Sequence, residues 1–236
     1  MKPLRIQTKR AAVRLEGLTK TYQQADDTRI VLKGVSTSFQ PGEFVAIRGR
    51  SGSGKTTLLN LLAGIDEPTE GRILFGDLAF NELTREQRTI FRRDHIGIIF
   101  QFFNLIPTLT LLENVLLPAE LSRQDASQAG DRARDLLDRV GLGGRFFDTP
   151  DRLSGGEQQR VALARAVMLK PMVILADEPT GNLDRKTGDV VMDLLDSLRT
   201  ESETLLIMVT HSHTLAERSD RVLLLENGVL TEADSG

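Results

Sequence analysis

The sequence predicts an α/β fold with a doubly wound core, antiparallel β elements towards both ends of the chain, and a helical insert. Short apolar runs at 44–47, 96–100, 173–176 and 205–209 are typical of buried parallel strands. Segments with apolar residues at helical spacing alternate with these runs, as strand–helix–strand connections require. A glycine-rich motif joins the first run to a helix. We therefore expect ligands at the carboxyl ends of the strands.

The N-terminal part of the chain supplies antiparallel elements. Residues 13–18 alternate apolar and polar positions like a strand, and 30–39 form a second strand region. The polar residues 23–29 between them are predicted to form a turn. A short strand and turn are predicted at 71–77, and the charged stretch 84–93 is predicted to be helical.

The insert is predicted at 102–155 and is mostly helical. It holds two predicted helices, 111–121 and 126–140, and the second has its apolar residues on one face. A dense group of apolar residues opens the insert; these residues are Phe102, Phe103, Leu105, Ile106 and Pro107. They are expected to form either a docking surface for a partner or the small core of the insert.

The core resumes after the insert, with helices at 156–169 and 184–199 and a terminal hairpin at Asn227-Gly228. We expect a single domain, 1–236. In it, 11–101 and 156–236 form the α/β core and 102–155 forms the helical subdomain.

The composition bounds the class of protein. The 236 residues include 30 basic and 33 acidic side chains, for a net charge of −3, so no nucleic-acid partner is expected. The chain has no cysteine, which excludes disulfides and cysteine-ligated metals. No apolar run approaches the roughly 20 residues that span a bilayer. No apolar segment follows the basic residues 1–10, so a secretory signal is not expected. We expect a soluble protein whose partner would supply any membrane spans.

The glycine-rich motif matches the phosphate-binding pattern G-x-x-x-x-G-K-[ST] of a P-loop, RecA-like core. Its residues are Gly49, Arg50, Ser51, Gly52, Ser53, Gly54, Lys55 and Thr56, followed by Thr57. The glycines let backbone N–H groups close on phosphate oxygens, and the following helix points its positive end at them. Lys55 is expected to reach the β- and γ-phosphates, and the Thr56 hydroxyl to bind Mg²⁺. The sequence therefore predicts a site for a nucleoside triphosphate.

Two acidic residues, Asp177 and Glu178, follow the apolar strand 173–176. A P-loop core places its second metal-binding group at this strand end. Asp177 fits the Mg²⁺ position, and Glu178 is placed to polarise a water for in-line attack on the γ-phosphate. A solvated strand end is the alternative interpretation of two adjacent acids.

Segment 153–160, Leu-Ser-Gly-Gly-Glu-Gln-Gln-Arg, places Ser154, Gly155 and Gly156 at a predicted helix start. Ser154 with Glu157 forms a capping-box pattern, which by itself explains a stable helix end. The same geometry leaves N–H groups that can hold an anion.

Together with Gln101, the phosphate loop, the acidic pair, Asn182-Leu183-Asp184 and His211, segment 153–160 resembles the ABC-type ATPase subunits over residues 12–232. The resemblance implies a role for each matching residue. Tyr22 would stack on adenine, Gln101 would contact Mg²⁺ and the attacking water, and His211 would hold the γ-phosphate. Ser154, Gly155 and Gly156 would bind the nucleotide held by a second subunit. Asp184 would link the two sites. His213 has no role in the family and is interpreted as structural.

Segments 99–110, 176–184 and 206–211 are similar to the lipoprotein-release and macrolide-export (LolD/MacB-like) branch of the family, and 182–189 most resembles the YbbA-type ATPases. Ser212 departs from the branch, which usually has an acid after the histidine.

The resemblance implies an ATP-hydrolysing subunit that uses ATP and Mg²⁺, forms a homodimer through ATP and drives an integral-membrane permease, of an export or lipoprotein-extraction type. The subunit would be cytoplasmic, held at the inner face of the cell membrane by the permease. The alternative is a signalling module that transmits a conformational change to a membrane partner without moving a substrate. A soluble ABC ATPase of DNA repair or translation is disfavoured by the acidic net charge and by the lack of a long coiled-coil insert.

Overall fold

The computed structural model describes residues 12–24 and 27–233. The N-terminal segment 1–10, for which no secretory signal was expected, lies outside the described residues. The chain divides into two compact units: Met1–Arg92 with Leu205–Gly236, and Arg93–Thr204. The predicted insert, 102–155, falls within the second unit, and its status as a separate subdomain stays a prediction.

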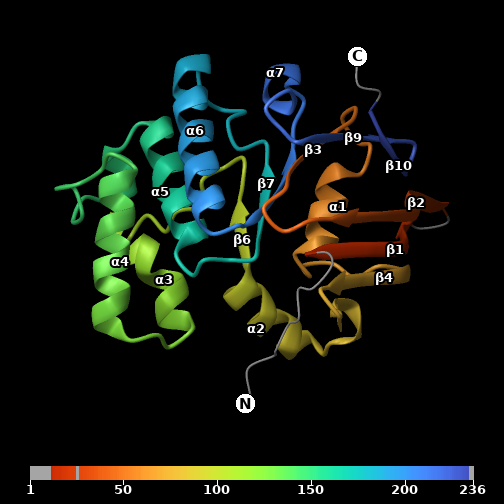
Figure 1. Ribbon diagram of the computed structural model, residues 1–236, viewed down its shortest axis with the longest axis horizontal. Coiled ribbons are helices and arrows are strands. Elements are labelled where there is room, and N and C mark those ends of the chain that lie inside the picture. Colours follow the sequence, from red (N-terminus) through yellow and green to blue (C-terminus); the bar gives the residue numbers. More distant parts are fainter. Residues whose placement is uncertain (1–11, 25–26, 234–236) are drawn as a thin grey trace. The chain divides into compact units, whose positions relative to one another are not determined.

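One sheet of the first unit is antiparallel and has the strand order β2-β1-β4-β5. Figure 1 shows β1 between β2 and β4. The strands are β1 (Val13–Gln24), β2 (Asp27–Phe39), β4 (Glu70–Phe75) and β5 (Leu78–Ala79). The first hairpin is longer than predicted, because pairs such as Tyr22↔Arg29 and Gln23↔Thr28 continue the ladder into the polar residues that were predicted as a turn. Ladder bonds are made by the backbone, so polar side chains do not end an exposed hairpin.

The other strands of the first unit run in the order β10-β9-β3-β8. They are β3 (Phe44–Arg48), β8 (Leu205–Val209), β9 (Arg221–Glu226) and β10 (Val229–Glu232). Strand β3 pairs in parallel with both β8 and β9, and β9 and β10 form the predicted antiparallel hairpin. The middle of this group is apolar and buried, as the sequence of β3 and β8 predicts.

Short helices complete the first unit. They are α1 (Lys55–Leu62), the 3₁₀ turn η1 (Phe80–Glu82), the start of α2 (Arg85–His95) and α7 (His213–Ala216). Phe75, Phe80 and Phe91 pack with ring centroids 4.9 to 5.1 Å apart. This aromatic cluster fixes β4, η1 and α2 to one another beside the helix that leaves the phosphate loop.

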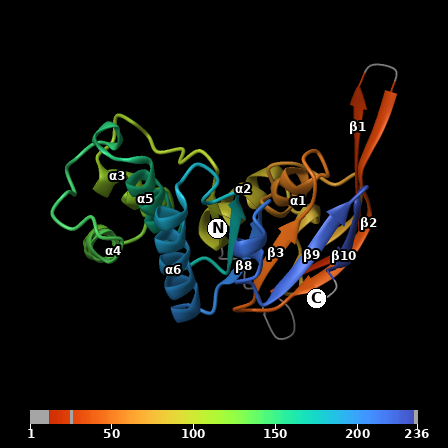
Figure 2. The same cartoon turned by 90° about the horizontal axis from the view of Figure 1, so that it is seen from above.

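The second unit contains two parallel strands and four long helices. They are β6 (Ile96–Ile99), β7 (Val173–Asp177), α3 (Leu111–Leu121), α4 (Ala126–Arg139), α5 (Gly155–Val167) and α6 (Arg185–Glu201), with a 3₁₀ turn η2 (Pro150–Arg152) before α5. Figure 2 shows α5 beside α3, α4 and α6. The buried face of α4 carries Ala129, Ala133, Leu136 and Leu137, as its apolar spacing predicts.

Candidate functional site

The phosphate loop lies between β3 and α1, in the predicted strand–loop–helix order. Gly52 and Gly54 have φ angles of 75° and 105°, which side-chain-bearing residues rarely adopt. A Cβ atom at Gly54 would also lie 2.8 Å from Val31 Cγ1. Gly54 is the N-cap of α1, and no side chain caps the helix there. The first-turn N–H groups of α1 are therefore not occupied by a capping side chain, which suits an anion.

Lys55 is turned into this loop and is only 7% exposed. Its Nζ donates to Gly49 O at 2.8 Å and to Arg50 O at 3.0 Å, so the ammonium lies on the loop itself. Ser53 Oγ is buried and has no hydrogen-bond partner among the described residues. Thr56 is exposed and Thr57 half-buried in the first turn of α1. A buried cation, an unpaired hydroxyl and an uncapped helix start fit a phosphate-bearing ligand.

His211 follows β8 at the same end of the sheet as the phosphate loop, because β8 and β3 are parallel and Thr210 N donates to Ile47 O at 3.2 Å. The His211 side chain is exposed. Ser212, the departure from the family branch, is the N-cap of α7, and its hydroxyl accepts a hydrogen bond from Leu215 N. Serine and aspartate are equally good N-caps, so the fold tolerates this replacement. His213 contacts the Arg48 guanidinium.

Tyr22 lies near the end of β1 and is half-buried. Its hydroxyl donates to Asp66 Oδ2 at 2.7 Å. Burial and this hydrogen bond raise the pKa of the Tyr22 phenol, while the side chain of Thr57, in the first turn of α1, acts in the opposite direction. The ring is thus attached to the segment that follows α1.

A cavity of about 540 Å³ adjoins the outer part of the phosphate loop. It is lined by residues of β2, by loop residues 50–53 and by the turn between β9 and β10. Arg29 reaches from β2 towards this loop, with its Nη2 3.4 Å from Gly52 O. The first unit therefore provides a polar recess on the β2 side of the loop.

Gln101, Asp177 and Glu178 of the second unit follow the carboxyl ends of two neighbouring strands, because β6 and β7 are parallel with Ile99 opposite Ala176. Asn182 Nδ2 donates to Gln101 O at 2.9 Å. A Cβ atom at Gly181 would lie 3.3 Å from Glu178 Cβ and 3.5 Å from Gln101 Nε2, so the two side chains flank this glycine.

Glu178 has a φ angle of 46°, in the left-handed region. A glutamate held there stores strain, and such strain is concentrated at functional sites. The turn that follows is closed by Gly181 N donating to Glu178 O at 3.0 Å.

Ser154 is the N-cap of α5 and forms the predicted capping box with Glu157. Ser154 N donates to Glu157 Oε2 at 2.8 Å, and Arg145 Nη1 donates to Glu157 Oε1 at 2.7 Å. The hydrogen bonds from the Ser154 backbone and hydroxyl lower the pKa of Glu157, which keeps this carboxylate ionised. The serine is therefore fixed in orientation before any ligand binds.

The glycines of the same turn lie against other elements of the second unit. A Cβ atom at Gly156 would lie 2.2 Å from Thr187 Cγ2, and one at Gly155 would lie 3.5 Å from the Phe103 ring. Thr187 Oγ1 donates to Asp184 Oδ2 at 2.6 Å, and this hydrogen bond leads the causes that lower the pKa of Asp184. The start of α5 and the Asp184 cap of α6 therefore form one packed corner.

Several residues that hold these groups were not predicted from the sequence. Asn182 was seen only as part of a family motif, although it anchors the Gln101 backbone. Lys20 and Asp66 contact each other across 46 positions and showed no pattern. Arg145 had no signal beyond its charge.

The family model described as ABC transporter matches residues 32–181 of the chain. The chain belongs to the ABC transporter family. ABC transporter ATP-binding proteins similar to it include Rv0986 of Mycobacterium tuberculosis H37Rv, 52% identical over 94% of this chain and 89% of that protein. YbbA of Escherichia coli K12 is 48% identical over 93% and 96%. The lipoprotein-releasing system ATP-binding protein LolD of Pseudomonas syringae is 44% identical over 95% and 99%.

Solved structures agree with the relatives. The ABC cassette MJ0796, in a dimeric post-hydrolysis state with ADP and Pi, has a TM-score of 0.85 and is 41% identical, covering 93% of this chain and 98% of that one. The predicted α/β fold, the ABC-type ATPase subunit and the LolD/MacB-like branch with YbbA-type relatives are thereby confirmed. Among the described residues, no helix is long and apolar enough to cross a membrane.

Proposed function

We propose that this ABC transporter subunit hydrolyses ATP as one of two identical chains that share each ATP, and that it drives an integral-membrane permease. The observation that carries the proposal is that the chain has two different helix starts suited to phosphate. The uncapped start of α1 belongs to the first unit, and the serine-capped start of α5 to the second. The similar cassette MJ0796 is dimeric in its solved structure.

In this proposal the first unit binds the nucleotide. Tyr22 stacks on adenine, and the N–H groups of Gly49 to Thr57 with Lys55 hold the phosphates. Thr56, Gln101 and Asp177 offer a hydroxyl, an amide and one carboxylate for Mg²⁺, the kind of oxygen set that Mg²⁺ shares with substrate phosphates. Bound Mg²⁺ would neutralise phosphate charge.

Hydrolysis is assigned to Glu178, Gln101 and His211. Glu178 polarises the attacking water, Gln101 orients it, and His211 donates to the γ-phosphate oxygens as negative charge moves on them. Ser154, Gly155 and Gly156 of one chain hold the γ-phosphate that the other chain binds, and Asp184 couples the two sites. The contacts among Gly156, Thr187 and Asp184 support this coupling.

Mixed dimers test whether two chains share each ATP. Lys55→Ala removes the loop ammonium, and Ser154→Arg blocks the α5 start with a bulky cation. Each variant alone should be inactive. In a mixed dimer, one shared site carries both changes and the other carries neither, so hydrolysis should reappear when the variants are combined.

A control mixture keeps both changes in one chain. The double variant Lys55→Ala/Ser154→Arg should stay inactive by itself. In a dimer with wild type it should leave no intact site, because each shared site then contains one altered residue. Absence of recovery in the first mixture, with mixed dimers demonstrated by two affinity tags, would show that one chain completes its own site.

The permease would bind the apolar loop after Gln101, placing the subunit at the cytoplasmic face of the membrane. Phe102 is 70% exposed and Ile106 is 36% exposed, whereas Phe103 and Leu105 are half-buried and Arg165 donates to the Phe103 carbonyl. The loop is therefore divided: Phe102 and Ile106 remain accessible to a partner.

Phe102→Ser with Ile106→Ser should weaken co-purification with native membrane proteins while basal hydrolysis persists. Phe147, which is 80% exposed in the same unit, supplies the matched control Phe147→Ser. Loss of membrane association with Phe147→Ser alone would contradict docking at Phe102 and Ile106 and would assign the docking surface to Phe147. The relatives' names are those of transporter proteins, which favours transport over the signalling alternative.

A further inference from the structure

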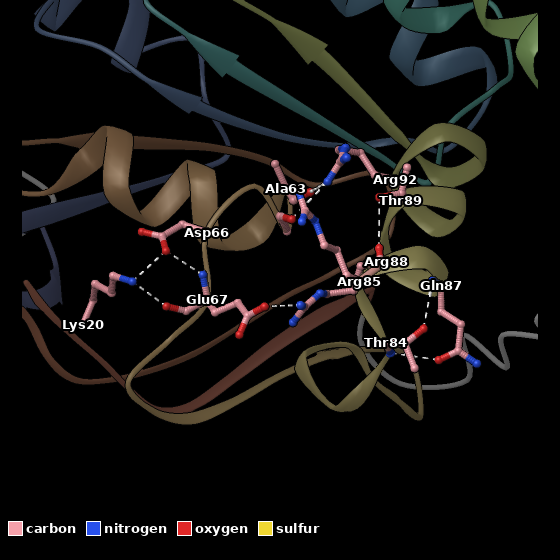
Figure 3. Close-up of polar contacts among 11 residues, drawn as sticks. Lys20, Ala63, Asp66, Glu67, Thr84, Arg85, Gln87, Arg88, Thr89 and Arg92 are labelled. Carbon is pink, nitrogen blue, oxygen red and sulfur yellow. Dashed lines mark hydrogen bonds and ion pairs between the residues drawn. The ribbon is translucent and has the colours of Figure 1, made fainter.

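A compact polar network lies behind Tyr22, within the first unit. Lys20 Nζ donates to Asp66 Oδ1 at 2.6 Å and to Glu67 O at 2.7 Å, and Figure 3 shows these two contacts. Asp66 Oδ2 accepts the Tyr22 hydroxyl at 2.7 Å, so one carboxylate holds both side chains of β1. Glu67 N adds a third hydrogen bond to Asp66, at 2.7 Å.

The network holds the buried ammonium of Lys20. Lys20 is 9% exposed, and its ammonium is paired with the Asp66 carboxylate. Burial raises the pKa of Asp66, but the hydrogen bonds from Lys20 and Tyr22 outweigh it and lower the pKa overall, so the carboxylate is ionised at neutral pH. Lys20 Nζ also lies 4.8 Å from the centroid of the Tyr22 ring, within the range of a cation–π contact. The ring is thereby held by its hydroxyl and by its π system.

The network is anchored to α1 and α2. Asp66 lies just after α1, the helix that begins in the phosphate loop. Arg92 of α2 donates to the carbonyls of Ala63 and Gly64 at the end of α1, and Arg88 of α2 pairs with Glu67 (Figure 3). The position of the Tyr22 ring is therefore set relative to the same helix whose start holds the phosphates.

We propose that Asp66 and Lys20 are positioning residues for the nucleobase. They fix the Tyr22 ring, and this strengthens the binding of a nucleotide that has a base without changing the binding of its phosphates. This rests on the proposed stacking role of Tyr22. Lys20 lies against the face of the ring, and the hydrogen bond from the Tyr22 hydroxyl to Asp66 limits the rotamers that the side chain can adopt. A ring that is fixed beforehand loses no further rotamer freedom when the base binds, and this pre-organisation favours binding.

Two ligands separate positioning from general stability. ATP has the base, and inorganic tripolyphosphate has only the phosphates that the loop would hold. We expect Tyr22→Phe, Asp66→Asn and Lys20→Met each to weaken ATP binding about three- to tenfold, the range expected for freeing one side chain. Tripolyphosphate binding should stay unchanged, because the phosphate loop is not altered. Isothermal titration calorimetry of the full chain gives both dissociation constants.

The matched control is Glu67→Gln, which removes the pair with Arg88 but keeps the backbone carbonyl that accepts Lys20. It should leave the ratio of the two dissociation constants at the wild-type value. If Asp66→Asn weakens ATP and tripolyphosphate equally, the network acts only through the stability of α1, and the positioning role is overturned.

Tyr22→Ala distinguishes this proposal from the one it rests on. If Tyr22→Ala leaves ATP binding unchanged, Tyr22 does not contact the base and the proposed stacking role fails. If Tyr22→Ala weakens ATP binding while Tyr22→Phe and Asp66→Asn do not, stacking stands and positioning is overturned. Weakening by all three, confined to ATP, supports positioning.

Discussion

The two glycine-rich helix starts of this chain are built in opposite ways. The phosphate loop has glycines with positive φ at Gly52 and Gly54, and no side chain caps α1. The turn before α5 has a complete capping box, and its glycines do not have positive φ among the described residues. Gly156 is required by packing instead, because a Cβ atom there would meet Thr187.

This difference indicates how each start can treat a ligand. At α1 the glycines have positive φ and no side chain caps the first turn, so the loop itself is suited to bind an anion. At α5 the capping box engages the N–H groups of Ser154 and Glu157, Arg145 pairs with Glu157, and Gly156 lies against Thr187 of α6. The first start is suited to bind a nucleotide without help. The second has a fixed cap and a packed turn, which fits the proposed contact with a nucleotide that the other chain binds.

Glu178→Gln should separate binding from turnover, and it is the largest effect we expect. If the first unit binds ATP on its own, removing this carboxylate from the second unit should slow hydrolysis by about 10²- to 10⁴-fold, the contribution typical of a general base, while ATP binding persists. Phosphate release measures the rate, and calorimetry the affinity. The variant should also accumulate as an ATP-bound dimer on size exclusion.

Glu203→Gln is the matched control for this experiment. Glu203 also has a positive φ, 49°, but lies in an exposed turn after α6. It should hydrolyse ATP at the wild-type rate. Near-normal hydrolysis by Glu178→Gln would remove the role assigned to Glu178 and leave its strained backbone without a catalytic reason.

Gly156→Ala tests the packing half of the comparison. The added methyl would lie 2.2 Å from Thr187 Cγ2, so one side must move. Overpacking of this kind typically costs about 1–3 kcal/mol of unfolding free energy. Thr187→Ser removes that methyl and keeps the hydroxyl that donates to Asp184, so Gly156→Ala/Thr187→Ser should recover most of the loss. Urea unfolding of the four chains measures the coupling.

The corresponding pair in the phosphate loop should show no such rescue. Gly54→Ala meets Val31 Cγ1 at 2.8 Å, but its φ of 105° is unfavourable for alanine whatever the space. Val31→Ala should therefore leave the cost of Gly54→Ala largely in place. Rescue in the phosphate loop, or its failure at Gly156, would contradict the distinction between a conformational and a packing requirement.

The sequence predicted the contiguous motifs of each candidate site and missed the contacts that residues far apart in the sequence make with them. The phosphate loop and the Ser154–Glu157 capping box are contiguous patterns, and each is present in the structure. Contacts between distant positions left no pattern, because side chains far apart in sequence meet only through the fold. Gly156 meets Thr187 of another helix, and Asn182 holds Gln101 across 81 positions.

The fold was predicted better than its exposed edges. The buried strands were found because their apolar runs are dictated by burial on both faces. The first hairpin was predicted too short, since the polarity of 23–29 reflects exposure and not the absence of a ladder. The Tyr22 network was missed for the same reason: a buried lysine at a strand position is not distinguished by sequence from an exposed one.

The smallest effect we expect is a dependence of the free energy of unfolding on acid pH, caused by the capping box at the start of α5. Hydrogen bonds from Ser154 lower the pKa of Glu157, whereas no side-chain carboxylate caps α1. A carboxyl group whose pKa is lower in the folded chain adds stability above its unfolded pKa of about 4.3, and this stability is lost as the pH falls through the folded pKa. Between pH 5 and pH 3.5, Glu157→Gln should therefore lose less stability than wild type, because glutamine keeps the capping box without titrating. Urea midpoints at the two pH values measure this.

Glu113→Gln changes the same kind of capping box at the start of α3, where no ion pair to the carboxylate is found among the described residues. The difference between the two variants measures what the nearby charges of Arg145 and Arg160 add to the capping box. Equal behaviour would show that the cap alone keeps Glu157 ionised.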